Sequence, residues 1–99
     1  MRLTSDEIAA IKEAAQGAFG DNAVVRLFGS RTDDNERGGD IDLHIETDPP
    51  TDEWRARVQF DHLLFRRIDP QKVDLILTKR GGATPRGFER IAYRDGIVL

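Results

Sequence analysis

The stretch Asp-Ile-Asp-Leu-His-Ile-Glu, residues 40–46, alternates polar and apolar side chains without interruption. In a β-strand, successive side chains point to opposite faces, so the three apolar residues would face a core and the polar ones the other way. The polar face carries Asp40 and Asp42, about 7 Å apart along the strand. Aspartate is disfavoured in strands, and two like charges on one face cost stability unless a cation or donors compensate. The pattern therefore favours a half-buried strand that presents either a cation site or, equally well, an ordinary solvated face.

The flanking sequence predicts both helices and further strands. Thr4 and Glu7 have the form of a capping box, and apolar residues then recur at helical spacing. The expected elements are a helix at 4–19, a strand at 23–28, a strand at 40–46, a helix at 51–68, a strand at 72–77 and a short helix from Thr84-Pro85 to Asp95. The second helix should pack through one broad apolar face, formed by Trp54, Val58, Phe60, Leu64, Phe65 and Ile68. This order indicates an α+β fold, with a small mixed sheet flanked by helices, in a single domain spanning residues 1–99.

Composition and charge narrow the classes of function. The chain has 99 residues, 38% hydrophobic and 33% charged, with no cysteine. No apolar run reaches the length of a membrane span and no signal-peptide core opens the chain, so we expect a soluble, cytoplasmic protein. Residues 1–50 carry five basic and eleven acidic residues, and residues 51–99 carry ten and seven, which gives −6 and +3. This balance argues against direct binding of nucleic acid through a general basic surface. It suits a cation in the first half and phosphates or an acidic partner in the second, although charge alone favours an unevenly charged solvated surface.

Two further features, the Gly29-Ser30 turn and Asp74, gain meaning when they are considered together with the strand at 40–46. Gly29 and Ser30 end the preceding strand, where a glycine lets backbone approach a ligand and a hydroxyl can bind phosphate. By itself, the Gly29-Ser30 pair is explained equally well by an ordinary turn. Asp74 lies in an otherwise apolar strand, where a carboxylate needs a partner: either a metal ion shared with the other carboxylates, or Lys72 or Arg80. The combination is much more specific than any of its parts.

The combination carries a resemblance to a known family. Leu-Phe-Gly-Ser-Arg at 27–31, followed by Gly-Gly-Asp-Ile-Asp-Leu at 38–43, resembles the DNA polymerase β-like nucleotidyltransferases. The likeness is strongest to the minimal nucleotidyltransferases, many of which are antitoxins of HEPN-domain toxins, and it covers most of the chain from Val24 onward. The family pattern is a Gly-Ser pair, then Asp-x-Asp, then an acidic residue on a later strand. The segment at 32–35 departs from it, because many members have a small residue and a glycine there.

The resemblance implies a fold, an activity and a set of site residues. The fold would be that of the polymerase β-like nucleotidyltransferases. The activity would be metal-dependent transfer of a nucleoside monophosphate, AMP from ATP, to a hydroxyl acceptor such as a tyrosine of a HEPN-type partner in a toxin–antitoxin system. Two Mg²⁺ ions would be held by Asp40, Asp42 and Asp74, and the nucleotide phosphates by Gly29, Ser30 and Arg31. The alternative is a non-catalytic antitoxin, a binding module that acts by complex formation.

Two other groups are interpreted as structural. His44 shares the strand face of Asp42, but residues next to a motif are mostly bystanders. Arg57 and Asp61 are four residues apart in the second helix, which favours a structural ion pair.

Overall fold

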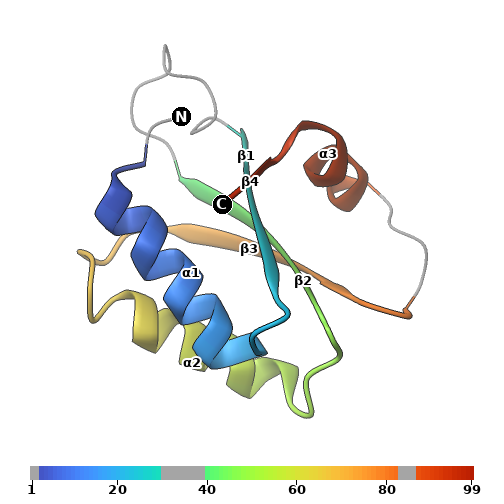
Figure 1. Ribbon diagram of the computed structural model, residues 1–99, viewed down its shortest axis with the longest axis horizontal. Helices are drawn as coiled ribbons and strands as arrows, with labels where there is room; N and C mark the ends of the chain where they lie inside the picture. Colours follow the sequence, from blue (N-terminus) through green and yellow to red (C-terminus); the bar gives the residue numbers. More distant parts are fainter. Residues whose placement is uncertain (1–2, 30–39, 83–86) are drawn as a thin grey trace.

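The computed structural model describes residues 3–29, 40–82 and 87–99, and these form one layered α+β unit (Figure 1). The elements in chain order are α1 (Ser5–Phe19), β1 (Val24–Phe28), β2 (Ile41–Thr47), α2 (Glu53–Leu64), β3 (Val73–Lys79), α3 (Phe88–Asp95) and β4 (Ile97–Val98). The strands form a sheet in the order β3-β2-β1-β4. β2 and β3 run parallel, whereas β1 is antiparallel to both of its neighbours. The expected small mixed sheet flanked by helices is therefore confirmed.

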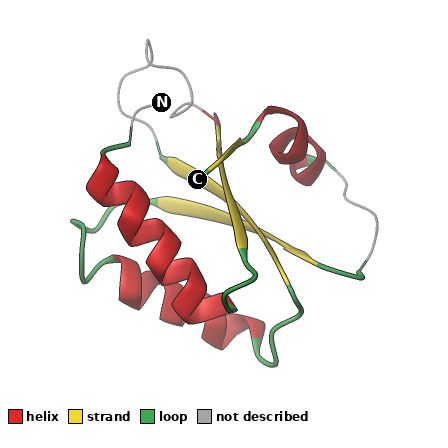
Figure 2. Cartoon of the chain, in the orientation of Figure 1, coloured by secondary structure: helices red, strands yellow, loops and turns green. Residues whose placement is uncertain are grey.

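The first helix begins as the sequence predicts. The Thr4 hydroxyl accepts a hydrogen bond from the Glu7 backbone N–H, and the Glu7 carboxylate accepts one from the Thr4 N–H. This reciprocal cap satisfies two of the four backbone donors that a helix start leaves unpaired. The buried face of α1 consists mainly of small residues: Ala10, Ile11, Ala14 and Ala15. Small side chains allow α2 to pack closely beside α1 (Figure 2).

The core lies between these two helices and one face of the sheet. Leu27 of β1 and Ile41, Leu43 and Ile45 of β2 are fully buried there. Burial of each such side chain contributes about 1.5–3 kcal/mol, which fixes the register of the central strands. The alternation then forces Asp42, His44 and Glu46 onto the opposite face, where α3 packs.

The second helix differs from its expected face and length. It ends at Leu64 rather than near Ile68, and its buried side chains are Ala56, Phe60 and Leu64. Trp54 and Val58, which were expected on the apolar face, are 75% and 49% exposed. Arg57 pairs with Glu53 at 3.4 Å and donates to the Leu75 carbonyl, so the expected pair with Asp61 is wrong.

The C-terminal part contains a strand that the sequence pattern did not predict. Ile97 pairs opposite Leu27, and the Leu99 N–H donates to the Val25 carbonyl at 2.9 Å, so β4 adds an edge to the sheet beside β1. The expected helix start at Thr84-Pro85 lies outside the described residues; the described helix α3 begins at Phe88. Within the described ranges, no helix is both long and apolar enough to cross a membrane.

Candidate active site

The three strands that carry the motif residues meet at one end of the sheet. Asp42 of β2 lies directly opposite Phe28 of β1 on one side and Asp74 of β3 on the other. A cavity of about 480 Å³ opens there. Its walls are built from three strands and α3, by Phe28, Gly29, Asp42, Asp74, Ile76 and Ile91. The parallel pairing of β2 with β3 places Asp74, which the sequence alone could have paired with Lys72 or Arg80, beside Asp42.

Gly29 fits against the Asp42 side chain more closely than another residue could. Its φ angle is +79°, a left-handed conformation that L side chains adopt at a cost. A Cβ placed on Gly29 would lie 2.2 Å from Oδ2 of Asp42 and 3.1 Å from its Cγ. The turn therefore needs glycine both for its backbone angle and for the space that the carboxylate occupies.

Asp42 and Asp74 form a pair of interacting carboxyl groups. Asp42 is half-buried and Asp74 is exposed. Burial, and next the neighbouring charge of Asp74, raise the pKa of Asp42 above its usual value, and Asp40 adds to the effect. A carboxylate whose ionised form is disfavoured in this way gains stability from a cation placed next to it.

Asp40 has a cationic partner at the edge of the site. It immediately precedes the first residue of β2, and its Oδ2 lies 3.3 Å from Nζ of Lys72, just before β3. The hydrogen bond to Asp40 is the main reason that the pKa of Lys72 is raised. Lys72 is a site-edge residue that the sequence analysis considered only as a partner of Asp74.

The donor set at this end of the sheet fits a divalent cation of the Mg²⁺ type. Mg²⁺ is bound in proteins by one or two carboxylates together with water and substrate phosphate oxygens. Asp42 and Asp74 supply those carboxylates. Because Gly29 has no Cβ, the Asp42 carboxylate can occupy space that any other residue at this position would fill. Among the described residues, no three His, Asp or Glu side chains form a complete protein-only metal site.

Two predicted nucleotide-binding residues cannot be placed in this geometry. Ser30 and Arg31 lie outside the described residues, as does the rest of the segment up to residue 39. Of the predicted phosphate-binding residues, only Gly29 is described, and it lines the cavity.

His44 belongs to a buried polar network under α3. It is fully buried, and its ring packs edge-on against Tyr93 with the centroids 4.7 Å apart. Nδ1 of His44 lies 3.5 Å from Nη1 of Arg26. Because the guanidinium can only donate, the ring hydrogen is on Nε2, which donates to the Thr78 hydroxyl at 2.9 Å. The Thr78 hydroxyl in turn donates to Glu89 of α3. Burial, followed by the charge of Arg26, lowers the pKa of His44, which favours the neutral ring.

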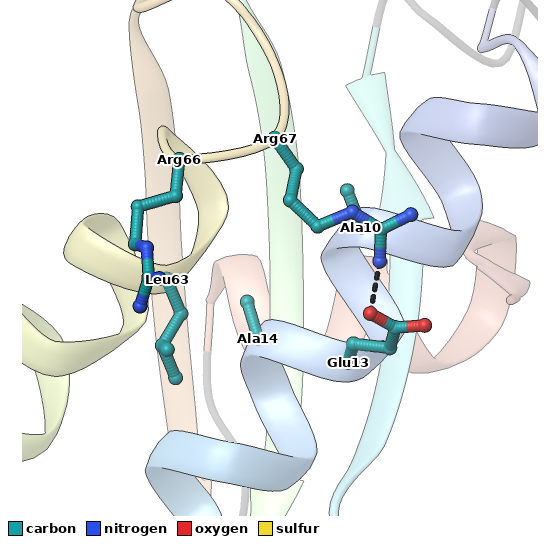
Figure 3. A pocket seen from close by; sticks show the side chains of 6 residues that line it. All are labelled: Ala10, Glu13, Ala14, Leu63, Arg66 and Arg67. Atoms are coloured by element: carbon teal, nitrogen blue, oxygen red, sulfur yellow. Dashed lines mark hydrogen bonds and ion pairs between the residues drawn. The ribbon is translucent and has the colours of Figure 1, made fainter.

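A second hollow lies on the helical side of the molecule. Figure 3 shows it between α1 and the end of α2, with Ala10 and Ala14 at its floor and Leu63 and two arginines around it. Arg67 is ion-paired with Glu13 across the hollow. None of the motif residues contributes to it, so the cavity beside Asp42 remains the candidate active site.

Comparisons with known proteins do not place the chain in a family. A scan against models of protein families finds no match, and a search of curated proteins finds no significant relative.

Proposed function

We propose that the protein is a metal-dependent nucleotidyltransferase with a polymerase β-like fold, which transfers a nucleoside monophosphate from an NTP to a hydroxyl acceptor. The observation that carries the proposal is the register of Asp42 and Asp74 on adjacent parallel strands, beside a glycine turn and a cavity. Phosphoryl-type transfer depends on positioning and charge neutralisation more than on covalent catalysis, which suits a site made of carboxylates and backbone.

The residues present would act by binding and by moving one proton. Bound Mg²⁺ would supply charge neutralisation at the triphosphate and lower the pKa of the acceptor hydroxyl. Asp42 and Asp74 would hold the cation, with Asp40 beside them. The acceptor oxygen forms a bond to the α-phosphorus, the bond from that phosphorus to the bridging oxygen breaks, and pyrophosphate leaves. Asp74, the more exposed carboxylate of the pair, would take the acceptor's proton.

The nucleotide and the acceptor follow from the sequence resemblance. We propose ATP as donor, AMP as the transferred group and a tyrosine of a HEPN-type partner as acceptor. By the same resemblance, a separate partner protein would supply the hydroxyl.

A second candidate function is favoured by one observation. Trp54 is 75% exposed and Val58, one turn further along α2, is 49% exposed. Exposed tryptophan is typical of protein–protein contacts, where it often dominates the binding energy. The alternative is an antitoxin that binds its partner through this face of α2 and does not transfer a nucleotide.

One experiment separates the two functions. The protein is incubated with Mg²⁺, each NTP in turn and a HEPN-domain partner, and intact masses are measured. A nucleotide adduct on the partner is expected with the wild type and should be lost in Asp42→Asn and Asp74→Asn. Asp69→Asn is the matched control, because Asp69 is exposed in the segment between α2 and β3 and does not line the cavity. A tight complex that never carries an adduct, and that Trp54→Ala disrupts, would establish the binding module instead.

A further inference from the structure

The lining of the candidate active site is of two kinds. Asp42 and Asp74 contribute carboxyl groups next to Gly29, and Phe28, Ile76 and Ile91 form an apolar wall beside them. Phe28 is the cross-strand neighbour of Asp42, and Ile76 is two residues beyond Asp74, so both lie on the same face of the sheet as the carboxylates. Ile91 joins them from α3.

Ile91 is the exposed member of this apolar wall. Both residues line the cavity, but Phe28 is 9% exposed whereas Ile91 is 39% exposed. Binding pockets for small molecules are mostly apolar, with a few polar groups that fix orientation. The cavity has this composition, and its volume of about 480 Å³ falls in the usual range for such pockets.

The position of this wall is fixed by the polar network behind it. The Thr78 hydroxyl donates to Glu89 of α3, and Tyr93 of the same helix packs on His44. The Arg26 guanidinium also lies 4.6 Å from the centre of the Tyr93 ring. Because α3 is held to the sheet from both its first and its last turn, Ile91 is in place before any ligand arrives, which reduces the ordering cost of binding.

We infer that Phe28, Ile76 and Ile91 bind the flat face of an aromatic ring of the substrate, while the neighbouring carboxylates take its phosphates through a cation. The inference rests on the proposed function, since it assigns the remaining part of the same cavity. A ligand that contacts both the carboxylates and the apolar wall must join a charged group to an apolar surface. In the proposed reaction two substrate groups have flat apolar faces: the nucleobase of the NTP and the phenol ring of a tyrosine acceptor. Both would be held by burial of ring surface on aliphatic and aromatic side chains.

Ile91→Ala and Ile97→Ala form a matched pair of variants for the test. Ile97 is 38% exposed, nearly the same as Ile91, but it lies in β4 and does not line the cavity. Alanine also retains the helix propensity of α3. Ile91→Leu, which keeps the apolar volume, serves as the rescue variant.

Binding is measured by calorimetry with ATP and with inorganic tripolyphosphate, each with Mg²⁺. If the ring is the nucleobase, wild-type protein binds ATP more tightly than tripolyphosphate. Ile91→Ala then weakens ATP binding about tenfold and leaves tripolyphosphate binding unchanged. Ile97→Ala and Ile91→Leu should bind both like the wild type.

A second arm identifies the phenol ring as the occupant. In that case ATP and tripolyphosphate bind alike, and Ile91→Ala weakens binding of N-acetyltyrosinamide, whereas N-acetylserinamide does not bind measurably. The inference is overturned if Ile91→Ala changes none of these affinities, or lowers those for ATP and tripolyphosphate equally.

Failure of the proposed function gives a different result. Wild-type protein would then bind neither Mg²⁺-ATP nor Mg²⁺-tripolyphosphate. Adenosine and N-acetyltyrosinamide carry a ring and no phosphate, so their binding to wild type and to Ile91→Ala still tests the apolar wall. Sensitivity of either ligand to Ile91→Ala supports the ring site; insensitivity of both removes it.

Discussion

Replacement of Gly29 by alanine should destabilise the protein and disturb the carboxylate pair together. The φ angle of +79° costs a non-glycine residue about 1–2 kcal/mol. The new Cβ would also lie 2.2 Å from Oδ2 of Asp42, and overpacking of this kind costs about 1–3 kcal/mol more. The sum is about 2–5 kcal/mol, a large part of the stability of a small domain.

Gly81→Ala isolates the steric part of this effect. Gly81 has a φ of +78°, almost the same as Gly29, but a Cβ there would meet no atom within 4 Å. Its replacement should cost only the backbone term of about 1–2 kcal/mol. The difference between the two variants is therefore the cost of the contact with Asp42.

Urea unfolding followed by circular dichroism measures both variants, with Asp42→Ala as a third background. Asp42→Ala removes Oδ2 and Cγ, the two closest atoms, and leaves only Cβ at 3.3 Å, so in that background Gly29→Ala should cost little more than Gly81→Ala. Mg²⁺ affinity of Gly29→Ala should also fall, because rotation of the Asp42 carboxyl away from the new methyl group takes it away from Asp74. Equal costs for the two glycine variants in the wild-type background, or a cost for Gly29→Ala that persists unchanged without the Asp42 carboxyl, would refute the reasoning.

Three further predictions concern the same end of the sheet and the network behind it. Because the pKa of Asp42 is raised in the folded state, its contribution to stability is fully present below the ordinary value of 3.8 and is lost as pH rises through the folded-state pKa. In metal-free samples taken from acid to neutral pH, Asp42→Asn should therefore gain melting temperature relative to the wild type. A melting-temperature difference between the two proteins that stays constant with pH would contradict this. Mg²⁺ at about 100 times its Kd should raise the free energy of unfolding of the wild type by about 2.7 kcal/mol, an effect that EDTA reverses and that Asp42→Asn abolishes; an equal effect on the variant would place the ion elsewhere. Thr78→Val leaves His44 Nε2–H without its acceptor and should cost about 1–3 kcal/mol in thermal unfolding, whereas Thr78→Ser, which keeps the hydroxyl, should cost clearly less.

The sequence was most informative where a local pattern fixes the structure. Strict alternation in residues 40–46 is enough to bury Ile41, Leu43 and Ile45, because a shift of one residue would expose all three. The cap formed by Thr4 and Glu7 likewise depends only on residues three apart. β4 has two residues and depends on a long-range pairing with β1, so no periodic signal could reveal it. Trp54 is apolar by type but lies outside the packed side of α2, which is set by where the neighbouring helix and sheet lie.

The candidate site was predictable in composition and less so in arrangement. The motif brought Gly29, Asp40, Asp42 and Asp74 into consideration, and all four lie at or beside one end of the sheet. The partner of each depends on a segment far away in the chain: Lys72 for Asp40, and the Asp42 side chain for Gly29. The apolar wall was missed because Phe28, Ile76 and Ile91 look like core residues in sequence. The alternation that places Ile76 on the face of Asp74 is the one signal that could have suggested it.

The pairing of β2 with β3 changes the central carboxylate pair from Asp40 and Asp42, which the sequence pattern suggested, to Asp42 and Asp74. Neighbours along one face of a strand are about 7 Å apart, whereas adjacent strands are about 4.8 Å apart. Asp42 and Asp74, directly opposite on β2 and β3, are thus closer partners than Asp40 and Asp42, and Asp40 has Lys72 to neutralise it. Burial first, and then repulsion from Asp74, raise the pKa of Asp42, and this repulsion works against the parallel pairing that brings the two carboxyl groups together. A strand face that only contacts water requires neither two adjacent carboxyl groups nor a glycine that leaves space for one of them. A cation bound between the two strands would reverse the sign of the interaction, and the same substitution, Asp42→Asn, should therefore stabilise the metal-free protein and destabilise the metal-bound one.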